Sequence, residues 1–208
     1  GARSPSVQLR ITPVGGLEVI STHDQILGGP SGQIFQACTF PADPAYARDV
    51  QELALAVGRV LQAKGALGRF GVDFVSVPGN DGWRHAAIEI NLRKGGTTHT
   101  FQMLQFLTQG RYDAGRAEFV TPDGGTRSYY ATDNVVNPAY RRLTPQDLFE
   151  IAEQRGLRWD TGSQTGVTFG LVGAIAECGK LGMVAIDVDT AAARRRFRGT
   201  VAVLDEEA

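Results

Sequence analysis

The chain has 208 residues, 42% of them hydrophobic and 21% charged, which suits one sizeable globular domain. Its net charge of -1 gives no overall attraction to nucleic acid or acidic membranes, and no run approaches the roughly 20 apolar residues of a membrane span. Two cysteines, Cys38 and Cys178, are too few for a disulfide scaffold, so we expect reduced thiols in a cytoplasmic protein.

The first predicted element is a β-hairpin over residues 7–22. Alternating apolar residues lead into a turn around Gly15 and out again. Arg10 lies on the face opposite Leu9 and Ile11. It is either a solvent-facing strand arginine or a functional cation, and the pattern alone leaves both open.

Residues 23–43 hold five turn-forming residues between short apolar pieces, which indicates loop or ribbon structure rather than helix. His23 and Asp24 are adjacent polar groups just past the strand. They form either a loop hydrogen bond or part of a substrate site. No nucleophile motif such as G-x-S-x-G accompanies them.

A helix is predicted over residues 43–64. Asp43 fits the N-cap, Pro44 fits the first helical position, and Gly65 ends the helix. An apolar stripe at helical spacing predicts its buried face, made of Val50, Leu53, Val57, Val60 and Leu61.

Residues 69–91 predict a second hairpin, closed by a cluster of turn-forming residues. A hairpin centred on Asp81 places Asp73 directly opposite Glu89, and Asn91 shares the face of Glu89. Two facing carboxylates repel each other, so three oxygen groups on one face indicate a hard divalent cation such as Mg²⁺. The alternative is a metal-free structural hairpin that tolerates the repulsion.

A glycine-rich segment over residues 92–97 then opens a short amphipathic helix. Gly95 and Gly96 let backbone N–H groups approach an anion, and the helix dipole favours negative charge there. Arg93 and Lys94 add positive charge at the same place. The segment therefore suits a phosphate or a carboxylate, with an ordinary strand–helix connection as the alternative.

The rest of the chain carries no chemical motif. Residues 111–143 predict irregular structure with short strands and an Asp-Gly hairpin turn around Gly124. Thr144 begins a helix with a capping box. Residues 165–188 predict strand–turn–strand, with a buried helix for the first run as the alternative. Residues 190–207 predict a final helix whose arginines lie mostly on its solvent-facing side.

Several motifs carry a resemblance to a known family. The run GVDFVSV…AAIEINLRKGG resembles the metal-binding hairpin of the ATP-grasp superfamily. The segments STHDQILGGPSGQIF, FPAD, GRFGVDF, EINLRKGGTTH and YATDN resemble ATP-grasp peptide ligases of the pheganomycin type. The resemblance covers most of the chain and implies an α+β fold: a C-terminal ATP-grasp lobe of mainly antiparallel sheet with flanking helices over residues 1–115, and a family-specific α/β extension packed on it over residues 116–208.

The resemblance further implies an ATP-dependent carboxylate–amine ligase that forms an amide through an acyl phosphate, releasing ADP and phosphate. The implied Mg²⁺ ligands are Asp73, Glu89 and Asn91. The implied phosphate-side cations are Arg10 and Arg93, and the implied cradle for ATP phosphate or acyl phosphate is Gly95, Gly96 and Thr97. The candidates for the substrate side are His23, Asp24 and Thr98.

ATP-grasp enzymes clamp ATP between two lobes, and this chain resembles only the second of them. We therefore expect the 208 residues alone to be inactive, and the longer protein to join a small carboxylate to an amine or peptide. Apolar surface left uncovered predicts a homodimer or docking to the N-terminal lobe. The alternative is a non-catalytic ATP-grasp-like lobe that binds a peptide or a partner.

Overall fold

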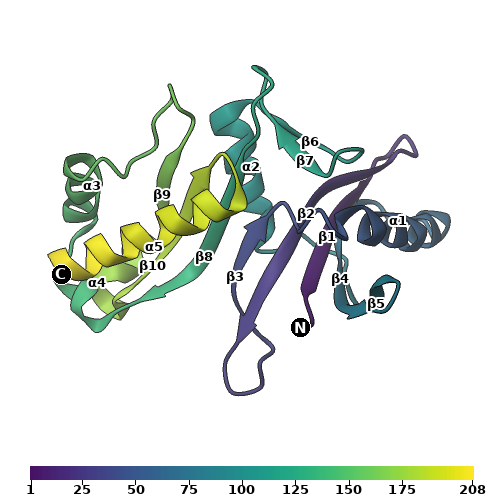
Figure 1. Cartoon of the computed structure of the whole chain (residues 1–208), viewed down its shortest axis with the longest axis horizontal. Helices are drawn as coiled ribbons and strands as arrows, with labels where there is room; N and C mark the ends of the chain where they lie inside the picture. The colour runs from purple at the N-terminus through teal and green to yellow at the C-terminus, as the bar shows by residue number, and fades with distance from the viewer.

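An eight-stranded sheet, antiparallel at every pairing, is the framework of the computed structural model, which describes all 208 residues (Figure 1). In spatial order its strands are β5 (Gly82–Asn91), β4 (Gly68–Gly79), β1 (Ser4–Ile11), β2 (Leu17–Gly28), β3 (Ile34–Phe40), β8 (Ser128–Val136), β10 (Lys180–Asp187) and β9 (Gly166–Gly170). The predicted α+β class with a mainly antiparallel sheet is confirmed.

Helices cover both faces of this sheet (Figure 1). Two of the helices lie on the same face of the sheet. Cross-strand partners share a face, and the register connects Val7, which packs under one helix, to Tyr130, which packs under the other. These are α1 (Ala47–Ala63) on β1 and β2, and α5 (Thr190–Glu207) on β8 and β10. The opposite face carries α2 (Thr97–Thr108). The separate strand pair β6 (Arg111–Asp113) and β7 (Glu118–Val120) contacts both the α2 cluster and the start of α1.

Shorter helices pack at the far end of the sheet. They are α3 (Pro145–Gln154), α4 (Ile175–Cys178), and the 3-10 turns η1 (Pro138–Arg142) and η2 (Val172–Ala174). The predicted capping box at the start of α3 is confirmed, since Thr144 and Asp147 each bond the other's backbone N–H. None of the chain's helices combines the length and apolar character that a membrane crossing requires.

Three large apolar clusters, and a smaller fourth one around Tyr46, hold the layers together. The cluster under α1 joins Val7 and Val72 to Val50 of the helix, and the cluster under α2 joins Phe40 and Tyr129 to Phe101. The third lies between β10, α3 and α5. Each large side chain that is fully removed from water contributes roughly 1.5–3 kcal/mol, so the two helix-covered faces are anchored over their whole length.

The first helix differs from its prediction in both its start and its rotation. Asp43 does not cap it: the Asp43 Oδ1 accepts a hydrogen bond from Ala45 N (2.9 Å) in a preceding turn, and α1 begins at Ala47. Leu53 and Val60, predicted to be buried, are 44% and 56% exposed.

A glycine explains why the helix is rotated in this way. Val50, Ala54 and Gly58 face the sheet, and a Cβ at Gly58 would lie 2.8 Å from a methyl group of Leu17. The helix therefore approaches the β1–β2 hairpin too closely for a larger side chain, and small residues rather than the longest apolar ones define the contact.

Strands extend further than predicted in two regions. The segment 23–43, predicted as loop or ribbon, holds the second half of β2 and the whole of β3. The segment 111–143, predicted as irregular, contains β8, a nine-residue strand between β3 and β10. The turn near Gly124 exists, but only a single bridge joins Val120 to Thr126 there. The strand prediction for 165–188 is confirmed by β9 and β10, although η2 and α4 form the link between them.

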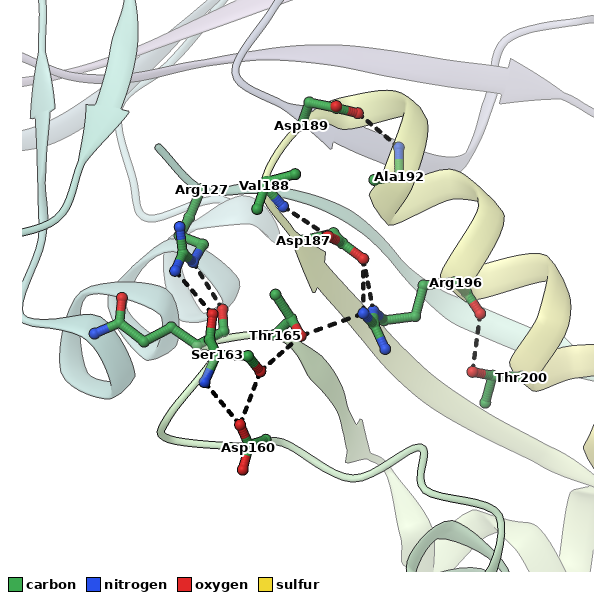
Figure 2. A network of polar contacts seen from close by, with 11 residues as sticks. Arg127, Asp160, Ser163, Thr165, Asp187, Val188, Asp189, Ala192, Arg196 and Thr200 are labelled. Atoms are coloured by element: carbon green, nitrogen blue, oxygen red, sulfur yellow. Dashed lines mark hydrogen bonds and ion pairs between the residues drawn. The ribbon is translucent and has the colours of Figure 1, made fainter. Parts of the chain in front are cut away.

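A polar network ties the loop before β9 to β10 and α5 (Figure 2). Arg127 donates to the carbonyl oxygens of Ser163 and Gln164 at 2.8 and 2.9 Å. Arg196 of α5 donates to the Asp187 carboxylate (2.9 Å) and to the Thr165 hydroxyl (3.2 Å). Figure 2 shows both arginines turned toward this loop from opposite sides, so the loop is clamped between the sheet and the last helix.

We expect Arg196→Met to lower the free energy of unfolding by about 1–2 kcal/mol, because the Asp187 side chain, 15% exposed, loses its cation while the apolar stem is kept. Arg195→Met, one position along and without a partner, should change it by less than about 0.5 kcal/mol. Urea unfolding at neutral pH measures both. Equal effects of the two variants would contradict the role given to Arg196.

Candidate functional site

One end of the sheet presents a polar face opposite α1. Side chains alternate along β1, so Val7 and Leu9 enter the core while Ser6 and Gln8 point to the other side. Ser6 pairs with Asp73 of β4, and cross-strand partners share a face. The residues brought together around one cavity of about 240 Å³ are Ser6, Gln8, Gln25, Phe35, Asp73, Glu89, Asn91, Arg93, Gly95, Gly96 and Thr97.

The carboxylates of Asp73 and Glu89 face each other, as predicted, but the register that achieves this differs. The hairpin closes on a two-residue turn that pairs Gly79 with Gly82, so its centre lies half a residue before Asp81. A β-bulge at Ile88 inserts one unpaired residue into β5 and brings Glu89 opposite Asp73. Without the bulge, Glu89 would be out of register with Asp73.

Electrostatic strain remains in this pair. Burial raises the pKa of Asp73 above its ordinary value, and the charge of Glu89 adds to the rise, while the Ser6 hydroxyl and the Gln25 amide oppose it. Asn91 Nδ2 donates to Asp73 Oδ2 at 3.1 Å. No lysine, arginine or histidine of the chain forms an ion pair with either carboxylate.

The donor set fits Mg²⁺ with phosphate oxygens as further ligands. Two carboxylates and one amide oxygen are too few for an all-protein cage, and the chain has no cluster of three or more acidic, His or Cys side chains suited to a metal. Mg²⁺ is commonly held by one or two carboxylates together with water and substrate phosphates.

The start of α2 forms the opposite wall of the cavity. Gly96 is the N-cap and no side chain caps the first turn. The Thr97 hydroxyl is buried without a hydrogen-bond partner. Arg93 lines the same wall. An uncapped helix N-terminus beside a cation favours an anion, because its N–H groups and its dipole both present positive charge.

Four predicted site residues lie elsewhere. Arg10 follows Gln8 on the same face but pairs with Glu18 (2.6 Å) outside the cavity, and Thr98 is buried in the first turn of α2. His23 and Asp24 belong to β2 rather than to a loop, so their side chains point to opposite faces. They do not form a common substrate wall.

Those two side chains have structural partners. The His23 ring is fully buried, with Nε2 2.7 Å from the Tyr129 hydroxyl, and Asp24 accepts from the Tyr46 hydroxyl (2.7 Å) and from Asp43 N (2.9 Å). Burial lowers the pKa of His23 to about 3, so its imidazole stays neutral near pH 7.

Sequence reasoning missed Ser6, Gln8, Gln25 and Phe35. The first two were within reach, because the alternation that placed Arg10 opposite Leu9 also places Ser6 and Gln8 on that polar face. Gln25 and Phe35 lay in the segment predicted as loop, where no face could be assigned.

We expect Asp73→Asn to stabilise the ligand-free chain at pH 7 by roughly 0.2–1 kcal/mol. A raised folded-state pKa means that the folded protein holds the proton more tightly, so stability falls as the pH rises from about 4 through that pKa, and asparagine removes the loss. Chemical denaturation at pH 7 and pH 3.5 checks this. The gain should vanish at pH 3.5, and Glu52→Gln on the exposed side of α1 should give none.

Two family models match parts of the chain. Residues 3–115, more than half of it, match the family described as IQCH-like, ATP-grasp. Residues 147–200 match the family described as PGM1 C-terminal domain. The first match contains every residue of the cavity.

A curated protein is similar over nearly the whole chain. It is the L-propargylglycine–L-glutamate ligase of Streptantibioticus cattleyicolor, 34% identical over 204 residues. The match takes in 97% of this chain and 40% of the relative, so the chain spans well under half of that protein's length.

Solved structures show the same fold at low sequence identity. The phosphoribosylaminoimidazole carboxylase ATPase subunit from Aquifex aeolicus is 13% identical with a TM-score of 0.58, over 97% of this chain and 56% of its own. N5-carboxyaminoimidazole synthetase from Staphylococcus aureus, solved with ADP, is 14% identical with a TM-score of 0.57, over 95% and 50%.

Proposed function

Since the chain belongs to the IQCH-like ATP-grasp family, in line with the ATP-grasp resemblance of its motifs, we propose that it is the C-terminal lobe of an ATP-dependent carboxylate–amine ligase. The main support is the single cavity between the facing carboxylates, Asp73 and Glu89, and the uncapped start of α2. The name of the S. cattleyicolor relative, a ligase of two amino acids, supports the reaction class.

In this proposal one wall of the cavity holds Mg²⁺ and the other wall binds the phosphoryl group. Asp73, Glu89 and Asn91 would hold Mg²⁺, which supplies charge neutralisation to the phosphates of ATP when it is bound. Burial and, after it, the charge of Glu89 raise the pKa of Asp73, and a bound cation would offset both. Arg93 and the N–H groups at Gly96 and Thr97 would bind the transferring phosphoryl group from the other side.

Arg10 stays a candidate for a second phosphate-side cation. It follows Ser6 and Gln8 on the same face of β1 and would reach the cavity if its exposed pair with Glu18 opened. Exposed ion pairs are worth about 0–1 kcal/mol, so a phosphate could compete for the guanidinium.

The proposed reaction has two steps. A substrate carboxylate oxygen attacks the γ-phosphorus of ATP, the bond from that phosphorus to the β–γ bridging oxygen breaks, and ADP leaves. The amine nitrogen of the second substrate then attacks the carbonyl carbon of the acyl phosphate, inorganic phosphate leaves, and the nitrogen loses a proton to water. Such chemistry depends mainly on positioning and on charge stabilisation, which the two walls of the cavity supply.

The finer parts of the proposal concern the whole protein. We propose that residues 1–115 are the metal- and phosphate-binding lobe, that residues 116–208 are a family-specific extension on it, and that an N-terminal lobe supplies the nucleotide base site. The 208 residues alone would then be inactive. The two cysteines are free rather than disulfide-bonded, which supports placing the enzyme in the cytoplasm.

Trapping the acyl phosphate tests the reaction. The longer protein, given ATP, Mg²⁺ and L-glutamate or L-propargylglycine, should release ADP, and added hydroxylamine should convert the acyl phosphate to a hydroxamate detected by mass spectrometry. The 208-residue chain should do neither. ADP release without any hydroxamate or amide product, across a panel of the 20 amino acids, would refute the ligase proposal.

One observation is compatible both with the ligase proposal and with its alternative, a non-catalytic lobe that binds a partner. The edge strand β5 and the residue after it expose Ile88 (62%), Ile90 (46%) and Leu92 (63%). In the ligase proposal the N-terminal lobe covers this edge, and in the isolated chain a second copy would cover it. Light scattering of the 208-residue chain should therefore show a dimer that Ile88→Lys converts to monomer.

A further inference from the structure

A second cavity lies on the same face of the sheet, on the other side of the α2 N-terminus. It has a volume of about 350 Å³, within the range of small-molecule sites. Its floor comes from β3, β8, β10 and β9, and its wall comes from α2, which contributes Gly96, His99, Thr100 and Met103. We call it the apolar chamber.

The chamber is apolar over most of its lining and polar at few points. Phe35, Met103, Ala131 and Val184 contribute hydrocarbon or thioether surface. Burial raises the pKa of Cys38 to about 12, so its thiol stays protonated and acts as a small apolar group rather than as a nucleophile. Such a lining selects against a charged side chain, because desolvating a charge there has no compensation.

Asp133 is the one carboxylate of the chamber. It follows Thr132 on β8, and its side chain makes neither an ion pair nor a hydrogen bond with any other residue of the chain. The charged residues of the first cavity, Asp73, Glu89 and Arg93, do not line the chamber. Asp133 is exposed, so its carboxylate is accessible from water to a ligand that brings an ammonium group of its own.

The two cavities meet at Phe35 and Gly96, which line both. A molecule in the chamber therefore lies next to the place where the proposed reaction transfers phosphate. In Figure 1, α2 lies behind the middle of the sheet, between the β4–β5 edge and the β8–β10 half.

We propose that the apolar chamber binds one of the two joined substrates, an amino acid or peptide N-terminus with an uncharged apolar side chain, and that Asp133 pairs with its ammonium group. This assignment rests on the proposed ligase function. It names the side-chain class that the enzyme selects and the residues that select it.

The methionines of the chain make a direct binding assay possible. There are only two, Met103 and Met183. Met103 lines the chamber from α2 and accepts a hydrogen bond from the Thr168 hydroxyl (3.3 Å), and Met183 lines it from β10 while also belonging to the core cluster between β10, α3 and α5. In the 208-residue chain labelled with ¹³C at the methionine methyls, L-norleucine should shift the Met103 signal in a saturable way. L-glutamate, of similar length but with a charged side chain, should shift neither.

Matched variants locate the binding. A Cβ at Gly170 meets nothing within 4 Å, so Gly170→Leu should fold, fill the chamber mouth and abolish the norleucine shift. Gly173→Leu, equally open but outside the chamber, is its control. Asp133→Asn should weaken norleucine binding by roughly tenfold and leave N-acetyl-L-norleucine unchanged, because only the first carries an ammonium group. Glu177→Gln controls for the lost charge.

Each result decides the proposal. No Met103 shift with norleucine at tens of millimolar, an equal shift with glutamate, or unchanged binding in Gly170→Leu would overturn the chamber. Equal weakening of both norleucine forms by Asp133→Asn would overturn the ammonium contact. Because the assay needs neither ATP nor Mg²⁺, norleucine binding in a protein that forms no acyl phosphate would refute the ligase function and keep the binding site.

Discussion

Replacing Glu89 by glutamine in the longer ligase is expected to lower kcat for amide formation on the order of 10²–10³-fold. The variant keeps the shape of the side chain and removes one of the two charges that would hold Mg²⁺ against the phosphates. At the same time the ligand-free 208-residue chain should become slightly more stable, because the opposing Asp73 no longer faces a like charge. A loss of kcat together with a gain in the stability of the ligand-free chain would identify a site that binds a cation.

Thermal unfolding separates the two effects. In the longer protein, Mg²⁺ with ADP should raise the wild-type melting temperature, and Glu89→Gln should remove most of that rise. Glu52→Gln, exposed on α1, should match the wild type in both assays. If Glu89→Gln stabilises the ligand-free chain and leaves both the nucleotide-dependent rise and kcat intact, the hairpin is a metal-free structural pair.

Lowering the pH from 6.5 to 5 is expected to destabilise the chain through His23 by up to about 1.4 kcal/mol per pH unit. Burial lowers the folded-state pKa of His23 to about 3, below the ordinary value of 6.5. The unfolded chain therefore takes up a proton that the folded chain does not. The stability is intact above pH 6.5 and is lost as the pH falls toward 3.

The surroundings of the His23 ring further disfavour its protonated form in the folded chain. The His23 Nε2 contacts the Tyr129 hydroxyl, which lies 3.1 Å from Thr100 Oγ1 in α2, and the His23 Nδ1 is buried without a partner. A charged ring has no room for water and no carboxylate to pair with. Urea unfolding at half-unit pH steps should give a steep fall in stability toward acid pH in the wild type and a much smaller one in His23→Gln. His99→Gln, which removes an exposed histidine, should keep the wild-type slope.

Local signals predicted the two hairpins, the α3 capping box and the last helix, because each depends on neighbours in the sequence. The pairing of Asp73 with Glu89 was predicted correctly from a hairpin centred on Asp81. The actual turn is centred half a residue earlier, and the bulge at Ile88 compensates for the difference. No sequence pattern marked that bulge. Sequence reasoning thus placed correctly the residues of one hairpin and of the helix start that follows it, and their role as a metal and phosphate site stays a prediction.

Residues whose role depends on distant strands were beyond local reasoning. β8 carries Asp133 and Asn134, which favour turns, yet the segment is a strand because residues on both sides of them pair with β10 and the two sit at a register shift in that ladder. The extension of β2 past Thr22 separated His23 from Asp24 in the same way. The apolar chamber draws on residues from Phe35 to Val184, so no window of the sequence could reveal it.

The bulge at Ile88 determines which residue of β5 faces Asp73 across the β4–β5 hairpin. Because side chains alternate along a strand, Glu89 would leave the face of Asp73 if the chain kept Ile88 but paired as a regular ladder, with Ile88 then opposite Asp73. Deleting Ile88 should instead leave Glu89 opposite Asp73, in a ladder without a bulge. Related chains whose turn differs by one residue should therefore keep the acidic pair only where a bulge has been gained or lost along with it.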